Sequence, residues 1–134
     1  MDAALQDLGE IIAISLPDCV TSTEVVCGEL VVHANRDSII KTLTFLRDDA
    51  NCHFKQLVDL CGVDYPEREE RFDVVYHMLS MTHNTRVRIK VRTDEDTPVP
   101  SVVELFSTAG WFERETWDMF GVYFSNNPDL RRLL

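Results

Sequence analysis

Basic residues are scarce in this 134-residue sequence, which has 13 Lys and Arg against 23 Asp and Glu and a formal net charge of −10. Proteins that bind the phosphate backbone of nucleic acids or anionic lipid headgroups need a clustered excess of Lys and Arg. The composition therefore argues against both functions. A hydrophobic content of 45% is that of an ordinary globular chain and argues against disorder.

Long apolar runs are also missing. A membrane-spanning helix needs about 20 consecutive apolar residues, and the longest clean run near the N-terminus is 11–14. The first residues are acidic, unlike the positively charged start of a secretory signal or the Arg-rich start of a mitochondrial transit peptide. These features predict a protein that faces the cytosol or is made inside an organelle.

Glycine is rare, with five residues in the whole chain. The sequence contains no G-x-G-x-x-G, no Walker loop, no G-x-S-x-G and no H-E-x-x-H. The sequence therefore does not predict a glycine-rich, phosphate-binding loop of the kind that nucleotide enzymes use.

The four cysteines, Cys19, Cys27, Cys52 and Cys61, form no C-x-x-C pair. We expect buried, reduced thiols and no metal site, because free cysteine often behaves as a small core residue. The alternative is a thiol or metal sensor, which would need Cys52, Cys61 and a histidine to converge.

Hydrophobic periodicity predicts the following elements. They are a helix that ends before Pro17, a hairpin of 24–26 and 30–32, a helix that begins near 37, a strand within 54–65, a hairpin of 72–81 and 86–93, and a loop over 94–100. A short helix through 106 should open with a capping box at Ser101–Glu104, break around Gly110, and be followed by a helix over 111–120. Gly121 should cap that last helix in the left-handed conformation.

This element order predicts an α+β fold: one domain over residues 1–134, with helices on one face of a mostly antiparallel sheet. In the helix near 37, we expect Ile39, Ile40, Leu43 and Leu46 to point inward. Strand 72–81 has apolar residues on both faces, which predicts a central strand covered on both sides.

Strand 86–93 alternates apolar residues with four cations, Arg86, Arg88, Lys90 and Arg92. One interpretation is a docking surface. The other is a solvated face whose cations pair with acids on neighbouring strands.

Helix 111–120 gathers Phe112, Thr116, Met119 and Phe120 in one sector and Trp111, Arg114, Glu115 and Asp118 in another. Glu115 and Asp118 could serve as an acid/base pair in a small stand-alone enzyme, and the second sector could instead be a solvated helix face. A protein-protein interface explains both the tryptophans and the charges, because Trp and Arg are enriched at interface hot spots.

Five segments resemble the 30-kilodalton subunit family of respiratory complex I, the C subunit of proton-translocating NADH:quinone oxidoreductase. They are C-G-V-D-Y-P (61–66), R-F-D-V-V-Y-H-M-L-S (71–80), G-W-F-E-R-E (110–115), D-M-F-G (118–121) and P-D-L-R-R (128–132). Weaker correspondence extends back through 45–49, so nearly the whole chain is covered.

The resemblance implies a non-catalytic core subunit with the 30-kilodalton subunit fold, inactive in isolation, that binds no cofactor. FMN and iron-sulfur clusters would lie on other subunits. This chain would lie in the peripheral arm against the D subunit, of the 49-kilodalton type, on the cytoplasmic side of a bacterial inner membrane or the matrix side of a mitochondrion. An equivalent subunit of a ferredoxin- or hydrogen-fed membrane complex is the alternative. The resemblance implies structural or docking roles, not catalytic ones, for Trp111, Glu113, Arg114, Glu115, Asp118, Phe120, Pro128, Asp129, Arg131 and Arg132.

The sequence departs from the family pattern in two places. Asn127 stands where the family usually has His, which weakens a proton-handling role there. Family members usually continue past this point with a basic, Pro-containing tail, so we expect the C-terminal tail of the family to be missing here. The cations of strand 86–92 and Arg131 and Arg132 are then predicted contact surfaces.

Overall fold

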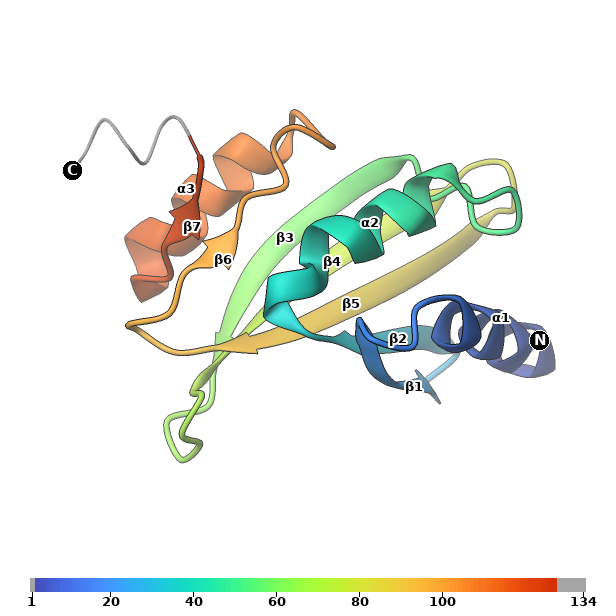
Figure 1. Ribbon diagram of the computed structural model, residues 1–134, viewed down its shortest axis with the longest axis horizontal. Helices are drawn as coiled ribbons and strands as arrows, with labels where there is room; N and C mark the ends of the chain where they lie inside the picture. The colour runs from blue at the N-terminus through green and yellow to red at the C-terminus, as the bar shows by residue number, and fades with distance from the viewer. Residues whose placement is uncertain (1, 128–134) are drawn as a thin grey trace.

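The chain forms a five-stranded sheet with helices packed on it (Figure 1). The computed structural model describes residues 2–127. In chain order the elements are α1 (Asp2–Ser15), β1 (Val20–Val26), β2 (Glu29–Ala34), η1 (Arg36–Ser38), α2 (Ile39–Asp48), β3 (Gln56–Asp64), β4 (Phe72–Ser80), β5 (Thr85–Thr93), β6 (Val99–Pro100), α3 (Ala109–Phe120) and β7 (Phe124–Ser125).

The strand order of the main sheet is β1-β2-β5-β4-β3. The β2–β5 pair is parallel and the other neighbouring pairs are antiparallel. The short strands β6 and β7 pair in parallel as a separate sheet. The α+β class and the mostly antiparallel sheet are thus confirmed.

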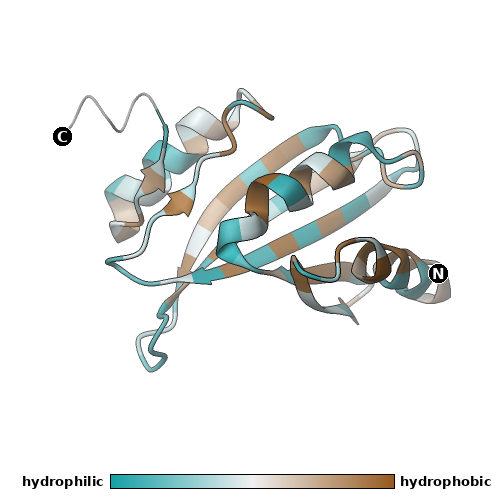
Figure 2. Cartoon of the chain, viewed as in Figure 1, coloured by the Kyte–Doolittle hydropathy of each residue, from teal (hydrophilic) through white to brown (hydrophobic). Residues whose placement is uncertain are grey.

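The two faces of the sheet differ in polarity, and Figure 2 shows apolar and polar residues alternating along β5. Val87, Ile89 and Val91 of β5 are fully buried, whereas Arg86 and Arg92 are exposed. The predicted alternation of this strand is confirmed. Cross-strand partners share a face, so the side that carries the β5 cations also carries His77 of β4, which pairs with Arg88. We call this side the open face.

The helices pack on the other side. Ile12 of α1, Leu43 of α2 and Tyr76 of β4 are each 0% exposed and belong to one apolar cluster, against which Phe112 and Phe120 of α3 also pack. The predicted placement of the helices on one face is confirmed. It follows from the helical spacing of the apolar residues, which gives each helix one face to bury.

Strand β4 is central, as predicted, since it lies between β5 and β3. Its core-facing residues are buried, and on the open face Asp73 and Val75 are only 6% and 4% exposed. Arg68 Nη2 lies 2.6 Å from Asp73 Oδ1 and contributes to this cover.

Several local expectations are wrong. Ile40 is 44% exposed, because Ile39 takes the inward position of α2 and the next residue is turned about 100° away. Val99 and Pro100 form β6, not part of a loop, because Phe124 and Ser125 of β7 lie beside them. Gly110 does not break a helix, since α3 begins at Ala109 and includes it.

The predicted capping-box helix at Ser101–Glu104 is also wrong. Residues 103–105 form a turn, with the Phe106 N–H donating to Val102 O at 3.0 Å. The Ser101 hydroxyl accepts from the Val103 N–H, but the carboxylate that joins it belongs to Glu113 of α3, not to Glu104. The left-handed cap at Gly121 is confirmed, with φ 76° and its N–H bonded to Trp117 O.

Candidate functional site

The outer stripe of α3 exposes two large apolar side chains. Trp111 is 67% exposed and Met119 is 73% exposed, and the charged residues Glu115 and Asp118 lie between them on the same stripe. Arg114 Nε lies 3.3 Å from Asp118 Oδ2, one helical turn away. Met119 thus does not share the burial of Thr116, with which the helical wheel had grouped it.

The inner side of α3 packs on β3. Gly62 faces Phe120 so closely that a Cβ built at residue 62 would lie 2.8 Å from the Phe120 ring. Phe120 also meets Phe72 edge-on, with ring centroids 6.0 Å apart. Thr116 is buried beside them. Phe120 is therefore a packing residue that fixes the helix on the sheet.

Glu113 is fully buried at the inner side of α3. Its Oε1 accepts from the Ser101 hydroxyl at 2.6 Å and from Asn127 Nδ2 at 2.8 Å, and its Oε2 accepts from the Val102 N–H at 2.9 Å. Burial raises the pKa of Glu113, and the hydrogen bonds oppose that rise. This carboxyl joins α3 to the segments before and after it, which is what a structural role would require.

The predicted site residues thus separate into two groups. Trp111, Glu115 and Asp118 face outward, with Arg114 partly buried beside them, whereas Glu113 and Phe120 face inward. Pro128, Asp129, Arg131 and Arg132 lie outside the described residues. The contribution of Ser101 and Asn127 to the Glu113 carboxyl was missed, because the capping-box pattern predicts bonds from Ser101 and Glu104 to backbone N–H groups and not a bond between Ser101 and a distant carboxylate.

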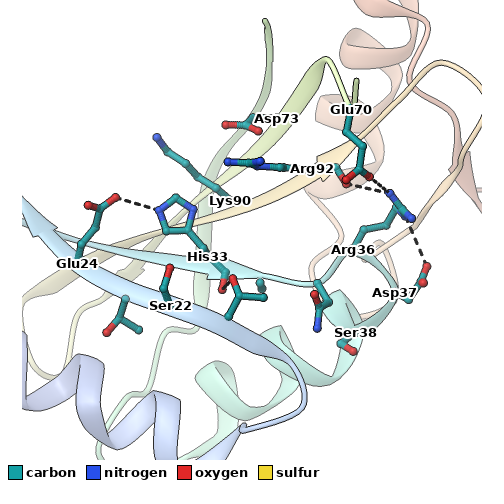
Figure 3. A pocket seen from close by; sticks show the side chains of 14 residues that line it. Ser22, Glu24, His33, Arg36, Asp37, Ser38, Glu70, Asp73, Lys90 and Arg92 are labelled. Carbon is teal, nitrogen blue, oxygen red and sulfur yellow. Dashed lines mark hydrogen bonds and ion pairs between the residues drawn. The ribbon is translucent and has the colours of Figure 1, made fainter. Parts of the chain in front are cut away.

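A polar groove of about 840 Å³ lies on the open face along β1, β2 and β5 (Figure 3). Three of its acids are already paired: Glu24 with His33 at 2.9 Å, Glu70 with Arg36 at 2.7 Å and Asp73 with Arg68 at 2.6 Å. Lys90 and Arg92 also line the groove, and their side chains make no ion pair with any residue from 2 to 127. The four acids of the lining, Glu24, Asp37, Glu70 and Asp73, slightly outnumber its three permanent cations, Arg36, Lys90 and Arg92, so the groove has no excess of positive charge.

The β5 cations divide between the two interpretations raised by the sequence. Arg88 forms an ion pair with Glu29 of β2, as expected of a solvated face with paired acids. Arg86, Lys90 and Arg92 have no such partner within the described part of the chain, as expected of a docking surface.

The cysteines do not converge as the sensor alternative required. All four are free. Cys19 and Cys52 are buried as expected, whereas Cys27 is exposed in the β1–β2 turn. Burial, with the Asp49 charge adding to it, raises the pKa of the Cys52 thiol to about 12.

Cys61 instead lies beside His77 of β4 and Asp59 of β3. The ligand atoms of these three side chains all lie within 4.8 Å of one another. Burial raises the pKa of the Cys61 thiol and lowers that of His77, so at neutral pH the thiol is protonated and the imidazole neutral.

Among residues 2–127, no helix is both long enough and apolar enough to cross a membrane.

Comparisons with known proteins agree with one another. A family model described as "Respiratory-chain NADH dehydrogenase, 30 Kd subunit" matches residues 32–134. The C subunit of NADH-quinone oxidoreductase from Paramagnetospirillum magneticum is 65% identical over 135 residues, covering 100% of this chain and 68% of that protein. The corresponding protein of Rhodospirillum rubrum is 61% identical, over 98% of this chain and 62% of that protein. The chain thus spans roughly two thirds of the length of these relatives.

A solved structure, the membrane-bound sulfane sulfur reductase, an archaeal respiratory membrane complex, contains a chain similar in fold. The TM-score is 0.78 at 25% sequence identity, and the match covers 92% of this chain and 72% of that chain.

Proposed function

Because the chain belongs to the family of the 30-kilodalton subunit of respiratory-chain NADH dehydrogenase, we propose that it is a non-catalytic core subunit of a proton-translocating NADH:quinone oxidoreductase, complex I. It supports assembly of the peripheral arm that carries electrons from NADH to quinone. FMN and iron-sulfur clusters lie on other subunits, and the D subunit, of the 49-kilodalton type, is its main partner. The complex places it on the cytoplasmic side of the bacterial inner membrane, or on the matrix side in a mitochondrion.

One observation carries the proposal: the outer stripe of α3 exposes Trp111 and Met119 at 67% and 73%. A tryptophan this exposed leaves most of its apolar surface in water unless a partner covers it, and Trp is among the residues that dominate interface energies. Arg114 and Asp118 flank this apolar surface as an ion pair, an arrangement typical of a polar interface rim.

The alternative of a stand-alone enzyme using Glu115 and Asp118 has less support. Both carboxylates are exposed, Asp118 is held by Arg114, and neither residue lines the groove on the open face. A general acid or base needs a substrate-binding cavity around it. The similar fold in an archaeal respiratory complex supports the other alternative, an equivalent subunit of a related membrane complex, but the relatives at 61% and 65% identity are C subunits of NADH-quinone oxidoreductase.

The proposal is tested by the double variant W111S/M119S of the full-length gene, expressed in place of the wild type. We expect a folded protein that recovers much less of the 49-kilodalton-type partner in a pull-down from membranes, with a matching loss of membrane NADH oxidation. The matched control is M81S, because Met81 is 71% exposed and lies in the β4–β5 turn.

Assembly and NADH oxidation at wild-type levels in the double variant would contradict the proposal. The variant E115Q/D118N separates it from the enzyme alternative. If these carboxylates were catalytic in a stand-alone enzyme, the variant chain would lose turnover; under the proposal it lowers recovery of the assembled complex instead.

A further inference from the structure

Three side chains of different chemistry meet on the open face. Asp59 and Cys61 are two residues apart on β3, so both point to the same side of the sheet. His77 of β4 is the cross-strand partner of Asp59. The intervening residue Leu60 and its partner Tyr76 point into the core, where they are 3% and 0% exposed, and this places the three polar side chains on the opposite side.

Their separations are close to those of a zinc site. One ligand atom from each side chain lies within 4.8 Å of the other two. In a tetrahedral zinc centre with bonds of about 2.0–2.3 Å, neighbouring ligand atoms are about 3.5 Å apart. The three residues lie on adjacent, directly paired strands, so this difference is one that rotation of their side chains has to close.

The donor types select the metal. A thiolate and an imidazole favour zinc, whereas magnesium and calcium require oxygen ligands. Charge also balances, because the Cys61 thiolate and the Asp59 carboxylate together neutralise a divalent ion. Of the two cations whose charges act on His77, Arg88 is already paired with Glu29, while Lys90 has no ion-pair partner in the described range.

We propose that Asp59, Cys61 and His77 form a Zn²⁺ site with three protein ligands, whose fourth position is left to water. The bound ion links β3, an edge strand, to the central strand β4. The inference is independent of the proposed function, since it rests only on side chains of this chain. The sequence analysis expected no metal site, and this proposal departs from that expectation. It shares Cys61 and a histidine with the sensor alternative, but the buried Cys52 is not one of its ligands.

The test is metal titration of the full purified chain, with Co²⁺ as a spectroscopic probe and Zn²⁺ as competitor. We expect one ion per chain and a thiolate-to-cobalt charge-transfer absorption that is lost in C61S. D59N and H77A should weaken zinc binding by at least about tenfold, since even the outer partners of zinc ligands typically contribute 10–100-fold. C27S is the matched control, because Cys27 is an exposed thiol outside the cluster, and it should behave as wild type.

Circular dichroism melting of each variant without metal controls for folding. Asp59 is only partly buried, so D59N is expected to stay folded even if a β4 substitution does not. The proposal is overturned if the wild-type chain binds no stoichiometric zinc, or if C61S keeps the cobalt thiolate absorption that C27S loses.

Discussion

The substitution Glu113→Ala gives the strongest test of how the α3 region is held together. It removes the acceptor of three hydrogen bonds at a fully buried position. A buried donor left without a partner costs about 1–3 kcal/mol. Counting only the Ser101 hydroxyl and the Val102 N–H, we expect a loss of about 2–6 kcal/mol. This is a large part of the total of about 5–15 kcal/mol that is usual for a domain.

The measurement is urea unfolding of the wild type and the variant, followed by circular dichroism. E115A is the matched control, since Glu115 is exposed on the same helix and its loss should stay within about 0.5 kcal/mol. In a double-mutant cycle, S101A should cost less in the E113A background than alone, because the two residues share one bond. A loss below about 1 kcal/mol in E113A would refute the structural role assigned to Glu113.

The same carboxyl has a defined effect on pH dependence. Burial raises the pKa of Glu113 above its ordinary value of 4.5, so the folded chain binds this proton more readily than the unfolded chain. Its contribution to stability is full below pH 4.5 and is lost as the pH rises through the folded pKa. The stability of wild type relative to E113Q should therefore fall across that interval and then level off. A difference that grows with rising pH would contradict the assignment.

Two further predictions concern β3. Gly62→Ala should destabilise the fold by about 1–3 kcal/mol in urea unfolding, because the new Cβ would lie 2.8 Å from the Phe120 ring. Gly110→Ala is the matched control and should not destabilise the fold in this way, because the nearest atom to its new Cβ would be 3.4 Å away. Equal effects of the two substitutions would contradict this packing. Arg71 donates two hydrogen bonds to Asp64, at 2.9 and 2.8 Å, which lower the pKa of Asp64. In R71Q the pKa of Asp64, followed by carboxyl NMR, should rise toward its ordinary value, and an unchanged pKa would count against this pairing.

Periodicity along the chain was enough to predict most of the elements. The alternation of β5, the apolar spacing of α1 and α2 and the glycine at the end of α3 are all present in the structure at or near the predicted residues. These features depend on neighbours within one or two turns or one strand, so the order of residues along the chain contains the information.

The errors fall where the partner is distant in sequence. The capping-box pattern at Ser101 led to Glu104, three residues on, while the carboxylate that binds Ser101 comes from Glu113. Strand β6 escaped detection because it consists of two residues whose partner lies 25 residues later, at Phe124. The helical wheel grouped Met119 with Phe112, Thr116 and Phe120, but the wheel does not say which sector meets the sheet, and Met119 is 73% exposed.

The family and the α+β class were accessible from the sequence, because motifs and periodicity are local properties. Only the tertiary structure decided that Glu113 is buried, that Phe120 packs on Gly62, and that Cys61 meets His77 rather than Cys52. The physical reason is that strand register and helix docking determine which distant side chains become neighbours, and these depend on packing of the whole core.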